Sequence, residues 1–146
     1  MKLEFVMRFP EGMPNGTAQM KGERIRYKIS GGRRVPYIQH YTKDDVVSAA
    51  RTFILQLKQH KPSKPYEGKL SLYVVFYFDI KNKKLWGTYK DTRPDLDNYV
   101  KLLNDQMTRC HYWKDDSQVV DLHVIKRYAE EASIYVRLSE VTEEET

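Results

Sequence analysis

The stretch from Leu70 to Phe78, Leu-Ser-Leu-Tyr-Val-Val-Phe-Tyr-Phe, is the longest apolar run of the chain and decides how the fold is read. Its side chains alternate between two faces, one with Leu70, Leu72, Val74, Phe76 and Phe78 and the other with Ser71, Tyr73, Val75 and Tyr77. Alternation with apolar residues on both faces is typical of a central β-strand that is covered on both sides. We therefore expect the domain to be built around this strand.

Downstream of this strand, residues 79–93 are polar, rich in lysine and without periodicity, which is typical of a loop that a ligand would order. A helix is predicted to begin after Pro94 and to run to about Cys110, because apolar residues recur at helical spacing. An adjacent polar side of the same helix holds Asp97, Lys101 and Asp105. Two further strands are expected at about 118–128 and 133–138.

Upstream, the alternation over residues 2–9 predicts an opening strand, and proline, glycine and asparagine interrupt residues 10–22. Residues 23–41 combine basic with β-branched and aromatic side chains around Gly31-Gly32, which indicates a basic hairpin. A helix should follow over residues 43–60. These elements predict an α+β fold, a single compact domain in which a mixed β-sheet packs against two main helices.

Length and composition narrow the class of protein. With 146 residues the chain is of ordinary single-domain size, and we expect one domain at 1–139 followed by an acidic tail at 140–146. The longest apolar run is far below the roughly 20 residues of a membrane helix, and no secretory signal is seen, so we expect a cytoplasmic protein. The single cysteine, Cys110, excludes a cysteine-rich zinc site.

The net charge of +5 is unevenly distributed. Lysine and arginine are concentrated at 21–34, 58–69 and 81–93. This distribution favours a polyanionic partner such as nucleic acid, although basic surfaces are often only solvated.

Two stretches contain the residues that could perform chemistry: Arg93-Pro-Asp-Leu-Asp-Asn-Tyr-Val-Lys101 and Trp113-Lys-Asp-Asp-Ser-Gln-Val119. Together they offer four carboxylates, those of Asp95, Asp97, Asp115 and Asp116. Hard divalent ions such as Mg²⁺ are bound by several oxygen ligands, usually carboxylates from separate segments. If the strand after residue 118 runs beside the start of the helix, the four carboxylates meet and could support metal-dependent phosphodiester hydrolysis.

Each of these residues also has an ordinary explanation. Asp95 could cap the helix, Asp97 could interact with the helix dipole or pair with Lys101 across one turn, and Asp115-Asp116 could form a turn. Taken singly, these explanations are favoured. The joint pattern changes the balance toward a metal site.

The two stretches together closely resemble the signature of the RusA family of Holliday junction resolvases. The resemblance rests on Asp95-Leu96-Asp97-Asn98, on Lys101 at the next turn, and on Trp113-x-Asp-Asp-x-Gln-Val119. More loosely, Lys21-Gly-Glu-Arg-Ile-Arg26 and Tyr41-Thr-Lys43 are similar to the family's basic strand and to its lead into the first helix.

The resemblance implies a RusA-like, homodimeric endonuclease that resolves four-way DNA junctions by paired symmetric nicks. It implies that Asp95, Asp97 and Asp116 bind catalytic Mg²⁺, with Mn²⁺ as a substitute, and that Lys101 acts beside them. Supporting positions of the family are matched by Asn98, Asp105, Asp115 and Gln118. DNA contacts are expected from Lys21, Arg24, Arg26, Lys90 and Arg93.

The chain also departs from the family's pattern. Pro94 replaces the last of the basic residues that often precede the first acid, and residues 79–92 are individual to this chain. Two alternatives therefore stay open: a non-catalytic nucleic-acid-binding module, which would bind DNA without nicking it in Mg²⁺, and a nuclease for flap or other branched DNA.

Overall fold

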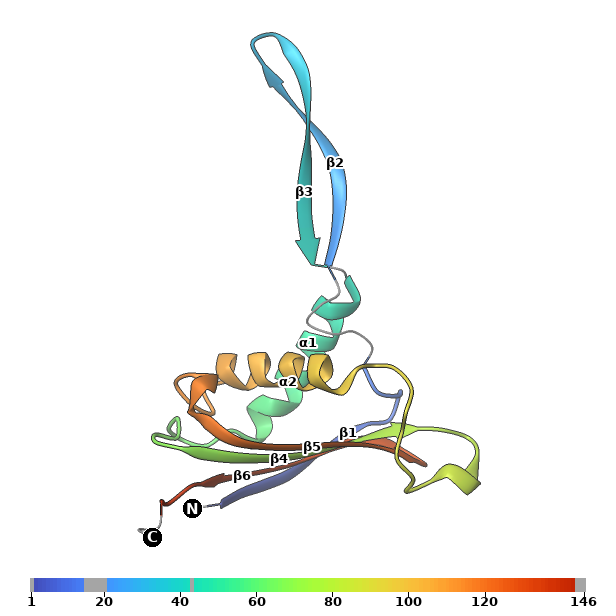
Figure 1. The fold of residues 1–146 in the computed structure, drawn as a ribbon, viewed down its shortest axis with the longest axis vertical. Helices are drawn as coiled ribbons and strands as arrows, with labels where there is room; N and C mark the ends of the chain where they lie inside the picture. The colour runs from blue at the N-terminus through green and yellow to red at the C-terminus, as the bar shows by residue number, and fades with distance from the viewer. Residues whose placement is uncertain (1, 15–20, 43, 144–146) are drawn as a thin grey trace.

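The computed structural model describes residues 2–14, 21–42 and 44–143. Figure 1 shows a layered body from which one long hairpin projects. In chain order the elements are β1 (Lys2–Phe9), β2 (Lys21–Ser30), β3 (Arg33–Thr42), α1 (Asp44–His60), β4 (Leu70–Asp79), η1 (Lys83–Leu85), α2 (Leu96–Arg109), η2 (Asp116–Gln118), β5 (Val119–Ala129) and β6 (Ala132–Glu140).

Four strands form a mixed sheet in the order β1-β6-β4-β5. The pair β4–β5 is parallel, and the other two pairs are antiparallel. A parallel pair needs a long crossover, and here that connection contains the helix α2. The predicted α+β fold with a mixed sheet and two main helices is confirmed, and the stretch from Leu70 to Phe78 is an interior strand of the sheet.

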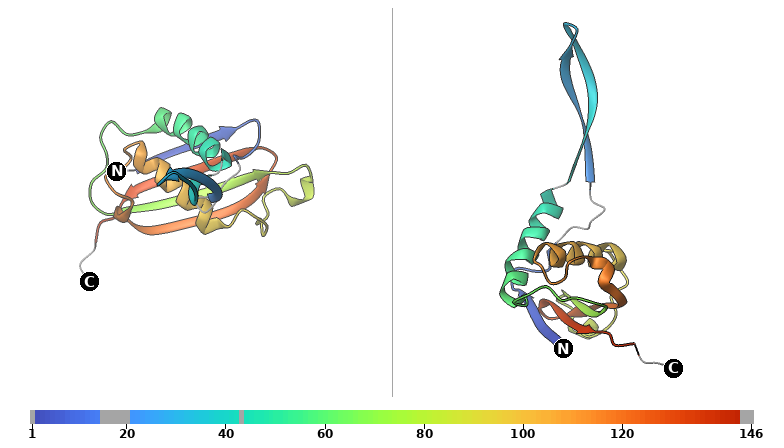
Figure 2. Two further views of the ribbon diagram at one scale, coloured as in Figure 1. Left: turned by 90° about the horizontal axis from the view of Figure 1, so that it is seen from above. Right: turned by 90° about the vertical axis from the view of Figure 1, so that its left-hand side faces the viewer.

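Both helices lie on the same face of the sheet (Figures 1 and 2). On that face Leu72 and Phe76 of β4 are fully buried. The ring of Tyr99 from α2 meets that of Phe76 edge-on, with 4.9 Å between centroids, and its hydroxyl donates to the carbonyl of Pro14 at 2.6 Å. Burial raises the pKa of this hydroxyl far above its ordinary value. Tyr99 thus joins α2 to the sheet and to the N-terminal segment.

The opposite face of β4 differs from the expectation, because no helix of the described ranges covers it. Its side chains are covered by neighbours from the same sheet instead. Tyr73 meets the ring of His123 at 4.9 Å and lies under the guanidinium of Arg137 at 4.7 Å, and Val75 is buried. Aromatic and cationic cross-strand neighbours therefore cover this face in part.

The predicted basic hairpin is present as β2–β3. Its strands pair from Lys21 with Thr42 up to Ser30 with Arg33, and the two residues between them, Gly31 and Gly32, both have positive φ. Positive φ at both central positions is what a two-residue hairpin turn requires. The hairpin extends away from the body (Figure 1), so most of its side chains face solvent.

The segment between β4 and α2 is attached to the outer edge of β5. Backbone hydrogen bonds join Gly87 to Tyr128 at 2.8 Å, Tyr128 to Thr88 at 2.9 Å and Lys90 to Lys126 at 3.0 Å. This stretch, which has no periodicity of its own, is ordered by contacts with a strand that is distant in the sequence.

Residues 141–143, after β6, contact the body of the protein. After β6, the backbone N–H of Val141 donates to the carbonyl of Lys69 at 2.9 Å, and the Lys69 ammonium pairs with Glu143. A separate acidic tail at 140–146 stays a prediction. No helix among the described residues has the length and apolar character needed to cross a bilayer.

Candidate active site along α2 and the turn before β5

The carboxylates and the lysine of α2 that belong to the predicted site lie on the outer side of this helix. Asp95 is the N-cap residue with extended backbone, and Asp97 lies in the first turn. The inner side of the helix is buried. Spacing of four residues brings Asp97, Lys101 and Asp105 into one row along the outer side, as the sequence predicts.

Lys101 forms an ion pair with Asp105, with 3.6 Å between Nζ and Oδ1. The sequence suggested a pair with Asp97, one turn in the other direction. In an isolated helix an acid one turn before a lysine is the better partner, so the surroundings of the helix favour the opposite choice here. In this structure the ammonium lies toward the C-terminal half of the row.

The turn before β5 is held by Trp113 and Gln118. Trp113 is fully buried, and its indole Nε1 donates to Thr108 Oγ1 at 2.7 Å. The Gln118 amide accepts from the backbone of Lys114 at 2.9 Å and of Asp115 at 3.1 Å. It donates to the carbonyls of Tyr66 and Gly68, both at 3.0 Å. These bonds fix the turn against the 66–68 segment.

The side chains of Asp115 and Asp116 make different contacts in this turn. Asp115 caps η2, because its carboxylate accepts from the backbone N–H of Ser117 at 2.9 Å, and that bond lowers its pKa. Asp116 instead faces the outer side of α2. Desolvation, then the hydrogen bond and charge of Asp115, and then the charge of Asp105 raise the pKa of Asp116, while Lys101 lowers it. Asp116 is therefore surrounded by carboxylates with one ammonium nearby.

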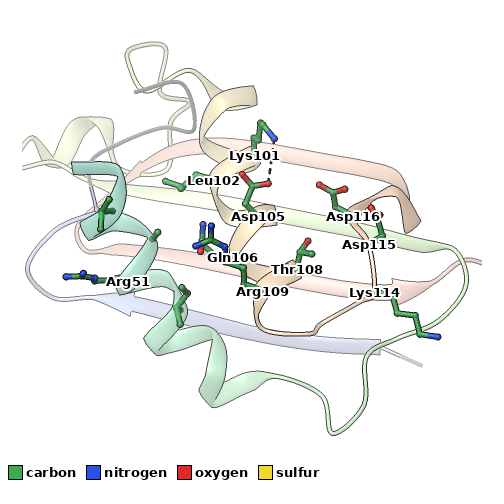
Figure 3. A pocket seen from close by; sticks show the side chains of 13 residues that line it. Arg51, Lys101, Leu102, Asp105, Gln106, Thr108, Arg109, Lys114, Asp115 and Asp116 are labelled. Atoms are coloured by element: carbon green, nitrogen blue, oxygen red, sulfur yellow. Dashed lines mark ion pairs between the residues drawn. The ribbon is translucent and has the colours of Figure 1, made fainter. Parts of the chain in front are cut away.

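An open pocket of about 770 Å³ lies between α1, α2 and this turn. Figure 3 shows Lys101, Asp105 and Asp116 around it, with the ion pair drawn as a dashed line. One wall is apolar and comes from α1, and further cations line the rim. The lining residues are Val47, Ala50, Arg51, Ile54, Lys101, Leu102, Asp105, Gln106, Thr108, Arg109, Lys114, Asp115 and Asp116.

The structure thus brings together part of the predicted site. Lys101, Asp105 and Asp116 share the pocket, whereas Asp95 and Asp97 are exposed at the start of α2 and are not part of its lining. Within residues 2–14, 21–42 and 44–143, no three acidic, histidine or cysteine side chains are close enough to form a metal site. The joint assignment of Asp95, Asp97 and Asp116 stays a prediction.

Sequence reasoning missed two of the cations that line this pocket. Arg51 is exposed on α1 and Arg109 is exposed in the last turn of α2. Neither belongs to a recognisable motif, and their proximity to Asp116 depends on how α1 packs beside α2. Their positions suit contacts with phosphate oxygens.

The residues predicted to bind DNA have different surroundings. Arg26 is exposed on the hairpin, where its Nε donates to Gln39 at 2.7 Å, and Arg93 is exposed just before α2. Lys90 is half-buried; its ammonium lies 5.0 Å from the ring centre of Tyr128 and donates to Thr92 Oγ1 at 2.6 Å. Its bonds are therefore internal to the protein. The side chains of Lys21 and Arg24 lie outside the described residues.

Known proteins resemble this chain along nearly its whole length. Residues 12–139 match the family described as Endodeoxyribonuclease RusA. A crossover junction endodeoxyribonuclease rusA of Lactococcus phage r1t is 37% identical over 143 residues, which are 97% of this chain and 100% of that protein. The uncharacterized protein YqaN of Bacillus subtilis (strain 168) is 38% identical over 133 residues, covering 82% of this chain and 88% of the relative.

The matched family is one of DNA-cleaving enzymes. The chain belongs to the RusA family of endodeoxyribonucleases.

Proposed function

We propose that this protein resolves Holliday junctions by paired symmetric nicks, in a reaction that depends on Mg²⁺ or, as a substitute, Mn²⁺. The observation behind the proposal is the pocket in which Asp116 from the turn before β5 faces Lys101 and Asp105 of α2, in a member of the RusA family. The phage relative is named for crossover junctions, which supports the same substrate here.

The residues at this site fit a hard divalent cation. Their donors are carboxylate oxygens. Desolvation, then the hydrogen bond and charge of Asp115, and then the charge of Asp105 raise the pKa of Asp116, and a cation there would relieve the repulsion among these acids. Asp116 would bind it from this pocket, and Asp95 and Asp97, which lie at the start of α2 outside the lining, would complete the set of ligands. When bound, a divalent cation stabilises the negative charge that develops on the phosphate during hydrolysis.

Lys101 would act on the phosphate. Its ammonium is exposed and is held by only one ion pair, with Asp105, among the residues that the structure describes. An ammonium that can move from a carboxylate toward a phosphate oxygen stabilises charge that appears only during the reaction. Asp105 would then keep Lys101 in place between turnovers.

DNA binding would depend on the hairpin and on the cations around the pocket. The segment from Lys21 to Thr42 contains six basic residues and one acidic residue. Arg26, Lys28 and Arg33 follow one face of the ribbon, since Arg26 pairs with Tyr37, Lys28 with Val35 and Ser30 with Arg33. A basic face on a projecting ribbon suits the phosphates of a junction arm.

A homodimer is the assembly that fits this reaction. Two like strands of a four-way junction are cut at symmetric places, and a twofold dimer presents two equivalent sites. We infer that two copies of this chain act together on the cytoplasmic DNA of the cell.

A cleavage panel tests the substrate. The wild-type protein is incubated in Mg²⁺ with four-way, three-way, flap and linear DNA of matched sequence. We expect paired symmetric nicks in the four-way junction and little cutting of linear DNA. Preferred cutting of flaps would assign another substrate, and binding without any cutting would indicate a non-catalytic module.

Asp97→Asn tests the site. This change removes a charge but keeps the shape of the side chain. Junction binding without Mg²⁺ should persist while cleavage in Mg²⁺ is lost. Cleavage at the wild-type rate would remove Asp97 from the site. Asp121→Asn is the matched control, because Asp121 lies on β5 and accepts from Ser71 Oγ at 2.9 Å, away from the α2 pocket.

A further inference from the structure

Lys126 connects β5 to the segment that leads into α2. Its ammonium donates to the backbone carbonyl of Thr92 at 2.7 Å and to that of Pro94 at 2.9 Å. The side chain is half-buried, and its residue lies beside Phe76 in the parallel register with β4. Pro94 immediately precedes Asp95, so one of these bonds ends on the peptide next to a proposed metal ligand.

The hydrogen bonds of the Lys126 side chain begin where the backbone hydrogen bonds between this segment and β5 end. Up to Lys90 the segment is held by backbone hydrogen bonds, of which the N–H of Lys90 to the carbonyl of Lys126 is the last along the segment. Beyond it, the Lys126 side chain reaches two carbonyls that lie further along the chain. Thr92 is also fixed through its own side chain, which accepts from Lys90 at 2.6 Å and lies 3.3 Å from the Tyr128 hydroxyl.

We propose that Lys126 is a positioning residue for the metal site, which it serves by fixing the peptide from Thr92 to Asp95. The inference rests on the proposed function. Asp116 directly precedes β5 and Lys126 lies within β5, so one strand sets the position of Asp116 and also holds the segment before Asp95 and Asp97. Bonds from an ammonium to two carbonyls are charge-assisted and have well-defined geometry. Lys126 does not need to touch the cation or the DNA for this task.

Lys126→Met tests the inference, because methionine keeps the apolar stem and removes the three donors. Loss of residues that orient metal ligands lowers metal affinity by about 10-fold or more. We expect the Kd for Mn²⁺, measured by electron paramagnetic resonance without DNA, to rise by about 10-fold. The Mg²⁺ concentration for half-maximal cleavage should rise in parallel. Lys126→Arg, which keeps donors and charge, should restore most of the affinity.

Lys84→Met is the control for removal of a lysine, since Lys84 is exposed in η1, within the segment that Lys126 contacts. It should bind Mn²⁺ like the wild type. A wild-type Kd for Mn²⁺ in Lys126→Met would overturn the inference, whether or not junction affinity or the Tm falls. If Lys126→Met does not fold, the same measurement on Lys126→Leu, which also lacks donors, decides in the same way.

A parallel measurement on Asp97→Asn separates this inference from the proposed function. If Asp97→Asn loses Mn²⁺ binding and cleavage while Lys126→Met keeps both, only the role of Lys126 fails. If Asp97→Asn also keeps both, the proposed metal site itself is wrong.

Discussion

Lys101 and Asp105 form an ion pair of 3.6 Å on the outer side of α2, in the same pocket as Asp116. Both side chains are substantially exposed, so the pair adds little to stability. It places the Lys101 ammonium in the pocket with Asp116, whose pKa is raised by desolvation and then by Asp115 and Asp105.

Lys101→Ala should slow cleavage by about 100-fold or more, as expected when a group that stabilises developing charge is removed. Affinity for Mn²⁺ should be retained, because lysine supplies no ligand oxygen. The Tm should change little, since exposed ion pairs contribute at most about 1 kcal/mol. Single-turnover cleavage at saturating Mg²⁺ is the measurement, and full activity would show that Lys101 is only a surface partner of Asp105.

Gln118→Leu should displace Asp116 without touching it. The change removes four hydrogen bonds that hold the turn, two of them accepted from the Lys114 and Asp115 N–H groups. Three of these bonds are exposed, so each contributes about 0.5–1.5 kcal/mol to the free energy of unfolding. We expect lower stability in urea and slower cleavage, with junction binding retained. Glu67→Gln, which removes only an exposed ion pair with Lys114, should keep stability and cleavage near wild type. An equal decrease in the two variants would contradict this role of Gln118.

The hairpin should provide affinity that depends on salt. Replacing Arg26, Lys28 and Arg33 by glutamine removes three charges from one face of the ribbon. The slope of log K against log salt should become shallower by roughly 0.9 for each phosphate that the variant no longer neutralises. Lys2→Gln, on β1 and paired with Glu4, is the control and should leave the slope unchanged. An unchanged slope in the triple variant would mean that the hairpin does not contact phosphates.

Much of the fold could be predicted from local patterns. Alternation in the Leu70–Phe78 stretch identifies the interior strand, and Gly31-Gly32 identifies the hairpin turn. The order of residues 80–94 could not be predicted, because it comes from Lys126 and other β5 groups distant in the sequence. It was equally unpredictable that the second face of β4 is covered by side chains of neighbouring strands and not by a helix.

The site was predictable to the extent that it follows from helix periodicity. Spacing places Asp97, Lys101 and Asp105 in one row, and the turn at Asp116 follows from its motif. Whether Lys101 pairs backward or forward along the helix depends on charges from another segment, which periodicity does not contain. The contribution of α1 to the pocket, including Arg51, likewise depends on helix packing.

The most direct test of the metal site is a crystal of the protein soaked in Mn²⁺ and measured at a wavelength where manganese scatters anomalously. We expect an anomalous peak between the start of α2, near Asp97, and the turn at Asp116. A peak elsewhere, or a crystal in which the carboxyl groups of Asp95 and Asp97 face away from Asp116 in the presence of the ion, would contradict a metal site shared by the two segments.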